Sequence, residues 1–231
     1  VHYSGAAAET VAFAERFNIP MAETQAGKSA VRWDHPLNMG GIGTTGSLAS
    51  NRLAREADLL ICIGTRLGDF PTASKSAFGH PDVSFLNINV SRFDAYKLNA
   101  HMIVADAKAA LQALSEALGQ VGYKSAHDPA ELSRLKAEWD AEVDRLYAKT
   151  LPDGLAQTKA IGTINEFVGE DDIIVCAAGS LPGDLHRLWR SKGLKTYHME
   201  YGFSCMGYEI SGSFGVKLAQ PDREVYALVG D

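Results

Sequence analysis

Cysteine is scarce in this sequence, and its few copies are scattered: only Cys62, Cys176 and Cys205 occur in 231 residues. This spacing offers neither a disulfide framework nor a zinc site, and it favours reduced thiols and a cytoplasmic location. The seven histidines include no HExxH or similar metal pair. No apolar stretch approaches the roughly 18 residues that a bilayer-spanning helix needs. The sequence therefore indicates neither a secreted disulfide protein nor a membrane-spanning one.

Long runs of one charge are also missing. There are 22 Lys and Arg residues against 28 Asp and Glu, which gives a net charge of -6. This balance argues against nucleic acid and anionic membranes as partners. Internal repeats and low-complexity tracts are absent as well. With 46% hydrophobic residues, the chain can bury one large core or two modest ones, and we expect two units.

Apolar runs alternate with stretches of helical periodicity along the chain. We expect helices at residues 6–17, 47–57, 107–118, 158–168 and 182–189, with Ser4 and Gly5 capping the first. Strands are expected at residues 20–23, 59–63, 83–90, 102–105, 173–177, 195–199 and 225–229. Those at 59–63, 83–90, 102–105, 173–177 and 225–229 are expected to be buried. This alternation predicts an α/β fold with parallel sheets covered by helices on both sides.

Residues 131–149 are strongly charged with a sparse apolar stripe, which predicts an exposed helix connecting the two units. The chain begins without an initiator Met and ends on a strand followed at once by a turn. We therefore expect a segment of a longer protein.

A glycine pattern at residues 41–47, Gly-Ile-Gly-Thr-Thr-Gly-Ser, matches the GxGxxG fingerprint of dinucleotide-binding proteins. That fingerprint needs a strand just before it and a helix just after. The helix is plausible, but residues 35–39 make a poor strand. A glycine-rich loop facing a cleft at the carboxyl side of the sheet fits better.

A second candidate, residues 177–182, reads as a strand end, a Gly turn and a helix start. Ser180 is a suitable N-cap, and Pro182 is tolerated in the first helical turn. The N–H groups of such a helix start can bind phosphate. An ordinary turn between strand and helix explains the pattern equally well.

A third candidate is the aromatic, glycine-containing stretch at residues 200–210, with Met206 as its long flexible side chain. It suits a ligand loop, although a buried strand-to-helix turn is at least as consistent with it. A fourth is Asp231, which follows Gly230 at the end of a strand and suits Mg²⁺, although a turn Asp capping a helix is the more common case. If the second, third and fourth candidates meet at one sheet edge, a diphosphate bridged by a metal could contact all three.

These residues resemble those of the thiamine diphosphate (ThDP) enzymes of the acetolactate-synthase type. Gly230 and Asp231 resemble the start of the family's GDG…N motif, whose Asp ligates Mg²⁺, and Met206 lies where the family holds ThDP in its bent shape. The resemblance implies two three-layer domains with parallel sheets: a central Rossmann-like domain at residues 1–128, a helical linker at 129–154, and the first part of the pyrophosphate-binding domain at 155–231. It implies a metal ligand at Asp231 and cofactor contacts from Gly179, Ser180, Leu181, Tyr201, Gly202, Phe203, Ser204, Cys205, Met206, Gly207, Tyr208 and Gly230.

Within this family, residues 23–28, 40–50, 64–72 and 200–209 are most similar to a branch that hydrolyses a cyclic 1,2-dione in inositol catabolism. This similarity implies C–C bond hydrolysis with ThDP and Mg²⁺, in a homo-dimer or homo-tetramer with active sites shared between subunits. Substrate contacts are expected near residues 43–47 and Tyr208, and no flavin is expected. Another ThDP enzyme, such as a carboligase or a 2-keto acid decarboxylase, and a non-catalytic nucleotide-binding module are the alternatives.

The glutamate that activates ThDP belongs to the family's N-terminal domain. We therefore expect the 231-residue segment alone to be inactive, and turnover by the isolated segment would refute this.

Overall fold

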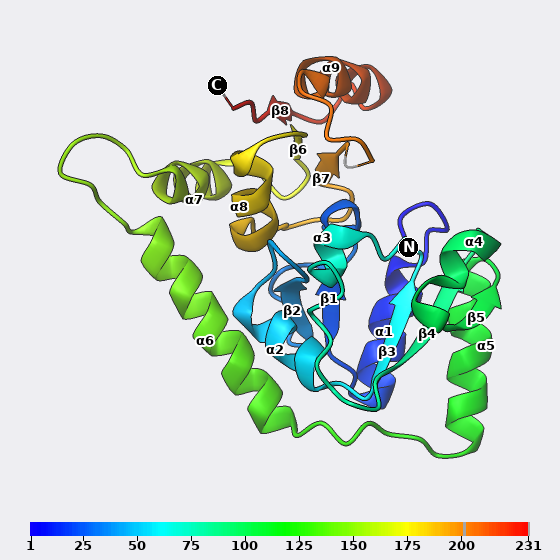
Figure 1. Cartoon of the computed structure of the whole chain (residues 1–231). Coiled ribbons are helices and arrows are strands. Elements are labelled where there is room, and N and C mark those ends of the chain that lie inside the picture. Colours follow the sequence, from blue (N-terminus) through cyan, green and yellow to red (C-terminus); the bar gives the residue numbers. More distant parts are fainter. Residues whose placement is uncertain (201, 231) are drawn as a thin grey trace.

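The computed structural model describes residues 1–200 and 202–230. Its strands are β1 (Met21–Glu23), β2 (Asn38–Gly41), β3 (Leu59–Ile63), β4 (Ser84–Asn89), β5 (His101–Val104), β6 (Ile173–Cys176), β7 (Tyr197–Met199) and β8 (Val225–Ala227). Its α-helices are α1 (Ala7–Phe17), α2 (Leu48–Glu56), α3 (Asp69–Thr72), α4 (Arg92–Ala95), α5 (Ala107–Gln120), α6 (Pro129–Tyr147), α7 (Gln157–Phe167), α8 (Ser180–Leu188) and α9 (Tyr208–Ala219), with 3₁₀ turns η1 (Gln25–Gly27) and η2 (Lys97–Asn99). Figure 1 shows α1 to α5 in a lower part and α7 to α9 in an upper part, joined by α6 along one side.

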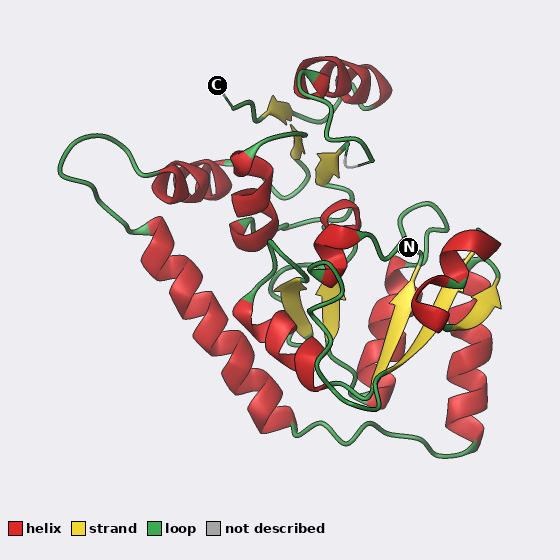
Figure 2. Ribbon diagram, in the orientation of Figure 1, coloured by secondary structure: helices red, strands yellow, loops and turns green. Residues whose placement is uncertain are grey.

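The lower part contains two parallel sheets. β1 pairs with β2, and β4 lies between β3 and β5. Helices α1 and α5 pack together beside the second sheet through a cluster that includes Phe13, Phe17 and Leu111 (Figure 2). The expected α/β architecture with parallel sheets is confirmed.

The upper part contains one parallel sheet with β6 in the middle, in the order β7-β6-β8. The four residues of β6 are at most 3% exposed, as the apolar run predicts. Leu185 and Leu188 of α8 pack into the same core together with Trp189. The buried central strand and the second half of α8 therefore share one core.

Three of the strands expected to be buried are not: β3, β5 and β8. In β5, Met102 and Val104 are 40% and 50% exposed. In β3, Cys62 is the one residue with a buried side chain, and Leu59 is 46% exposed. In β8, Val225 and Tyr226 are half-buried and Ala227 is exposed. Each strand lies at the edge of its sheet in the described structure, so it has a neighbouring strand on one side only. An apolar run does not show whether its strand is central or at an edge.

Helix α6 is more than an exposed linker. Leu132 and Leu135 pack with Met39 of β2, and Val143 belongs to the core of the upper sheet. Asp128 caps the helix by accepting a hydrogen bond from the N–H of Ala130. The apolar stripe was too sparse to predict that the helix packs along both parts.

The expected cap of the first helix is wrong. Helix α1 has Ala6 at its N-cap position, and no side chain caps it. Ser4 and Gly5 lie in the turn that precedes this residue.

Within residues 1–200 and 202–230, no helix combines the length and apolarity that crossing a membrane requires.

Candidate functional site

Three of the expected binding segments meet at one edge of the upper sheet. All three strands run parallel, with Cys176 of β6 opposite Met199 of β7 and Val175 of β6 opposite Ala227 of β8. The chain therefore leaves β6, β7 and β8 at the same edge. Residues 177–179, 200–207 and 228–230 follow these strands directly. The expected convergence at one carboxyl edge is confirmed for the described residues.

The β6–α8 turn offers backbone N–H groups for an anion. Gly179 has φ +98°, and a Cβ at this position would meet nothing within 4 Å. Its glycine is therefore required by the backbone conformation, and the space beside it is open. Gly179 is the N-cap of α8, and no side chain caps the helix. The N–H groups of the first turn, including those of Ser180 and Leu181, are thus placed to bind a diphosphate.

The interpretation of Ser180 as the N-cap is wrong. Ser180 is the first residue of α8 itself. The positive φ of Gly179 turns the backbone one residue earlier than the Ser-x-Pro pattern suggests.

A buried carboxylate, Glu209, ties two of the three segments together. It is 3% exposed, and its Oε1 accepts a hydrogen bond from the N–H of Ala178 at 3.3 Å. Its Oε2 accepts one from the N–H of Gly207 at 3.0 Å. Glu209 therefore fixes the β6–α8 turn against the start of α9. Nothing in the sequence indicates this role, because a Glu in the first turn of a helix is normally solvated.

The β7–α9 loop is shaped by Glu200. Its two carboxylate oxygens accept hydrogen bonds from the N–H groups of Phe203 and Cys205, each at 3.0 Å. These backbone hydrogen bonds hold the pKa of Glu200 below its ordinary value. Ser204 takes φ +50° and Gly207 φ +86°, which completes the bend.

The same loop presents its apolar side chains to the outside. Phe203 is 90% exposed and Met206 is 88% exposed, and Gly202, Ser204 and Cys205 are exposed as well. The alternative of a buried strand-to-helix turn is therefore wrong. Exposed apolar side chains on a fixed loop can contact a ligand or another protein surface.

Tyr208 is paired with a histidine that the sequence analysis did not single out. The hydroxyl of Tyr208 lies 2.6 Å from Nε2 of His198, which is on β7. Burial lowers the pKa of His198 and raises that of Tyr208. The Tyr208 ring also occupies the space beside Gly212, where a Cβ would lie 2.6 Å from the ring.

Of the remaining expected ligands, the structure describes Gly230, at the end of the third segment. The N–H of Leu228 donates to the carbonyl of Val175 at 2.9 Å, which extends the pairing beyond β8. Gly230 follows at the carboxyl edge and is exposed. Tyr201 and Asp231 lie outside the described residues. Among residues 1–200 and 202–230, no group of three His, Cys, Asp or Glu side chains is placed to hold a metal ion.

The glycine-rich loop at residues 41–47 is filled by protein. Contrary to expectation, the strand β2 does precede it, and α2 follows with Ser47 as its N-cap. However, a Cβ at Gly41 would lie 2.6 Å from the ring of His186, and one at Gly43 would lie 2.0 Å from the carbonyl oxygen of Phe70. The glycines therefore serve internal packing, and the expected cleft beside this loop stays a prediction.

A buried hydrogen-bond network joins the lower part to the upper sheet. Gln25 donates to the carbonyl of Pro182 in α8 at 2.9 Å and accepts from the hydroxyl of Tyr197 at 3.1 Å. Sγ of Cys176 donates in turn to the Tyr197 oxygen at 3.3 Å. Next to this network, Nζ of Lys28 and Oε2 of Glu23 form a buried ion pair at 3.7 Å. Burial raises the pKa of Glu23 and lowers that of Lys28.

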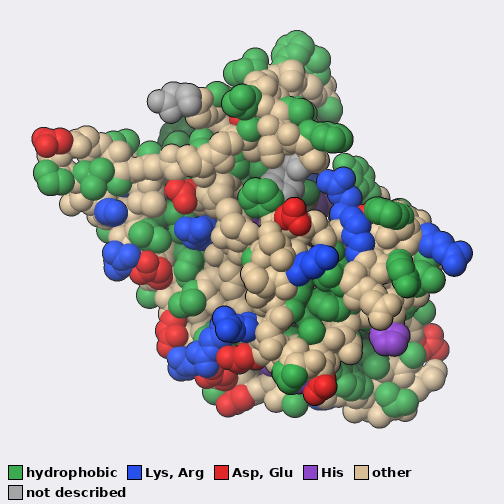
Figure 3. Space-filling view, in the orientation of Figure 1, with side chains coloured by type: hydrophobic (Ala, Val, Ile, Leu, Met, Phe, Trp, Pro, Cys, Tyr) green, Lys and Arg blue, Asp and Glu red, His purple; other side chains and the backbone are tan. Residues whose placement is uncertain are grey.

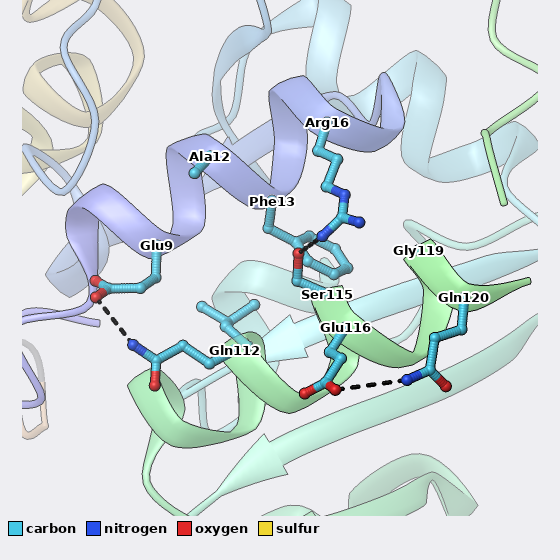
Figure 4. Close-up of a pocket in the computed structure, with 10 residues that line it drawn as sticks. Glu9, Ala12, Phe13, Arg16, Gln112, Ser115, Glu116, Gly119 and Gln120 are labelled. Carbon is cyan, nitrogen blue, oxygen red and sulfur yellow. Dashed lines mark hydrogen bonds between the residues drawn. The ribbon is translucent and has the colours of Figure 1, made fainter. Parts of the chain in front are cut away.

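A groove of about 610 Å³ lies elsewhere, between α1 and α5. Figure 4 shows it lined by Phe13 and by polar side chains, among which Arg16 donates to Ser115 at 2.9 Å. None of the expected site residues lines this groove, so it is separate from the carboxyl edge of the upper sheet.

Two family models match the chain. Residues 1–114 match the central domain of thiamine pyrophosphate enzymes, and residues 177–231 match their C-terminal TPP-binding domain. The chain belongs to the thiamine pyrophosphate enzymes. The second match includes all three segments at the carboxyl edge, so a site for ThDP (thiamine pyrophosphate) is expected there. The open helix start at Gly179 fits the diphosphate of this cofactor.

Curated relatives share about half of their residues with this chain. A Geobacillus thermodenitrificans protein is 52% identical over all of the chain, and a Bacillus subtilis protein is 52% identical over 99% of it. A Bacillus cereus protein is 50% identical over the full chain. Each is named 3D-(3,5/4)-trihydroxycyclohexane-1,2-dione hydrolase. The chain spans 39% of the length of each of these relatives.

Proposed function

We propose that this chain is part of a ThDP- and Mg²⁺-dependent hydrolase that opens the ring of 3D-(3,5/4)-trihydroxycyclohexane-1,2-dione in myo-inositol catabolism. The observation that carries the proposal is the set of three loops at one carboxyl edge, in a chain about 50% identical throughout to relatives named for this reaction. The proposed reaction adds water across the C–C bond between the two carbonyl groups and gives 5-deoxy-glucuronate.

When bound, ThDP supplies a nucleophilic carbon and an electron sink for cleavage of this bond. The chain's part is to bind and orient the cofactor. The first-turn N–H groups of α8 would hold the diphosphate, and Asp231 would provide a carboxylate oxygen to Mg²⁺. Met206 would support the bent cofactor from the β7–α9 loop. Glu209 keeps that loop and the β6–α8 turn at a fixed separation through its two hydrogen bonds.

The cofactor site is tested by calorimetric titration of ThDP into the full parent protein with and without Mg²⁺. An Asp231→Asn variant should lose the Mg²⁺-dependent binding, because an amide is a weaker ligand for this hard cation. Asp222→Asn, an exposed change of the same kind, is the matched control and should bind normally. Binding that needs neither Mg²⁺ nor Asp231 would disprove this metal site, and no binding at all would favour the nucleotide-binding module.

Turnover then separates the hydrolase from other ThDP enzymes. The loaded parent protein should convert the cyclic dione to the ring-opened acid and should leave pyruvate unchanged. Release of CO₂ or formation of acetolactate from pyruvate would instead indicate a decarboxylase or a carboligase.

We also propose that the protein forms a homo-dimer or homo-tetramer. Helix α9 supports this with three apolar side chains at four-residue spacing: Ile210, Phe214 and Leu218 are 63%, 66% and 67% exposed. An apolar stripe of this kind is normally covered by protein, either by a second subunit or by the part of the longer relatives that this chain does not span. Sedimentation of the parent protein should give a dimer or tetramer that Phe214→Glu dissociates. A wild-type monomer, or an unchanged assembly in the variant, would argue against this use of α9.

A further inference from the structure

The loops at the carboxyl edge contain no cationic side chain. Neither Lys nor Arg occurs among residues 177–183, 200–209 and 228–231, whereas Glu200, Glu209 and Asp231 all belong to these segments. The dione substrate carries hydroxyl and carbonyl oxygens on neighbouring carbons. Ring opening gives a carboxylate, so the product is an anion. A cation that binds this substrate must therefore come from another segment.

Arg66 of the lower part reaches these loops. A Cβ at Gly202 would lie 3.7 Å from Nη2 of Arg66 and 3.1 Å from Oε1 of Glu200. The guanidinium thus lies over the β7–α9 loop, on the side where Glu200 holds the loop's backbone. In the space-filling view, basic side chains gather between the upper sheet and α4 (Figure 3).

The backbone that carries Arg66 is held in place. The amide of Asn89, at the end of β4, donates to the carbonyl of Thr65 at 3.0 Å. Leu67 takes φ +48°, and its side chain packs against the cluster formed by Cys62 and Phe85. The residues on both sides of Arg66 are therefore anchored, which limits where its side chain can reach.

Among the described residues the guanidinium of Arg66 has no short-range partner, although the charge of Lys97, together with that of Arg66, lowers the pKa of Asp94. Within residues 1–200 and 202–230 it makes no hydrogen bond or ion pair, and the side chain is exposed. By contrast, both oxygens of the nearby Glu200 are occupied by the loop's own N–H groups. Arg66 thus has free donors in a planar, fork-like arrangement that matches a carboxylate or two adjacent oxygens.

We propose that Arg66 binds the oxygens of the dione substrate and the carboxylate of the product, and so determines substrate specificity from the lower part of the molecule. This inference rests on the proposed function. The bond that Arg66 makes would be to substrate and product, and the cofactor would be held by the segments that follow β6, β7 and β8.

The test uses the full parent protein loaded with ThDP and Mg²⁺, and four proteins: wild type, Arg66→Ala, Arg66→Lys and Arg92→Ala. Arg92 is an exposed arginine of α4 and serves as the matched control. We expect Arg66→Ala to lower kcat/KM for the dione about 30- to 100-fold, mostly through KM, because a charged hydrogen-bonding partner is lost. Arg66→Lys should recover only part of this, since lysine cannot bind two oxygens in the same fork. Arg92→Ala should stay within about twofold of wild type.

Two binding measurements complete the test. Calorimetry with 5-deoxy-glucuronate should show weaker product binding in Arg66→Ala, while the affinity for ThDP stays within about twofold. An unchanged kcat/KM and product affinity would overturn the proposal, and so would a parallel loss of ThDP affinity, which would assign Arg66 to the cofactor. If wild type neither converts the dione nor binds the product, the proposed function itself has failed. That result differs from one in which wild type and Arg66→Ala convert the dione equally well, which would overturn only the role of Arg66.

Discussion

His186 fills the space beside Gly41, although the two residues belong to different parts of the molecule. The ring is 1% exposed, and its Nε2 lies 2.9 Å from the carbonyl oxygen of Glu23, to which it donates. Nδ1 lies 2.9 Å from the hydroxyl of Thr45. Nε2 must carry a proton for its bond to a carbonyl. Burial lowers the pKa of His186 to about 3, so the ring is neutral near pH 7 and Nδ1 accepts from the Thr45 hydroxyl.

This buried neutral histidine predicts that the protein loses stability in mild acid. The unfolded chain binds a proton near the ordinary pKa of 6.5, whereas the folded chain does so only near pH 3. The stabilisation of the folded protein by the neutral His186 ring is therefore complete above pH 6.5. It is lost progressively as the pH falls from 6.5 toward 3. At pH 5 the loss is about 2 kcal/mol.

Urea unfolding between pH 5 and 7.5 measures this slope. His186→Gln should flatten it, even though the variant is less stable overall. His101→Gln, at an exposed histidine, is the control and should keep the wild-type slope. A His186→Gln variant with an unchanged slope would assign the acid sensitivity to other groups.

Most strands and long helices could be predicted from local pattern, but α9 and β2 were missed, and the burial of individual residues could not be predicted. The apolar run at residues 173–176 predicts β6 correctly, and the parallel order of the upper sheet follows from the alternation of strands and helices. The similar run at residues 59–63 is at an edge, because burial depends on which strands pair.

The candidate site shows the same limit. The positions of residues 177–179, 200–207 and 228–230 at one edge could be predicted, because they follow three strands that run parallel in one sheet. The roles of Glu209 and His198 were missed, because each depends on a partner brought close only by folding. His186 is still harder to predict, since its contact with Thr45 spans 141 positions of the sequence.

The glycine loop before α2 gives a second prediction. Gly43 has φ +94°, and a Cβ there would lie 2.0 Å from the backbone oxygen of Phe70. Gly43→Ala must move the α3 backbone and adopt a strained φ, so it should lower the free energy of unfolding by about 3 kcal/mol or more. Gly68→Ala is the matched control, because Gly68 has an ordinary φ of -76° and open space. Gly68→Ala should change the free energy of unfolding by no more than about 1 kcal/mol. A gain in stability would come from the reduced conformational freedom of the unfolded chain. Thermal unfolding of both variants checks this, and equal effects would contradict the packing role of Gly43.

Glu209 gives a third prediction, which links stability to cofactor binding. A Gln side chain offers one acceptor oxygen, and its amide group would face one of the two N–H donors that Glu209 now binds. Glu209→Gln should therefore lower the free energy of unfolding by about 1–3 kcal/mol. It should also weaken ThDP binding, because the β6–α8 turn and the β7–α9 loop are no longer held together. Unfolding and ThDP titration of Glu209→Gln, with exposed Glu116→Gln as control, measure both effects. Normal ThDP affinity in a destabilised variant would limit Glu209 to a structural role.

Met206 separates a ligand-binding side chain from a structural one. Since it is 88% exposed, Met206→Ala removes little packing and should change the free energy of unfolding by less than about 0.5 kcal/mol. Leu185 is fully buried in the core of the upper sheet, and Leu185→Ala should cost about 2–5 kcal/mol. If Met206 supports the cofactor, ThDP affinity and turnover of the loaded parent protein should fall in Met206→Ala despite its normal stability. Met206→Leu, which keeps the side-chain volume, should retain most of both. If Met206→Ala has normal ThDP affinity and turnover, the exposed methionine does not support the cofactor. If Met206→Ala instead loses as much stability as Leu185→Ala, the methionine is packed against protein in the assembled enzyme.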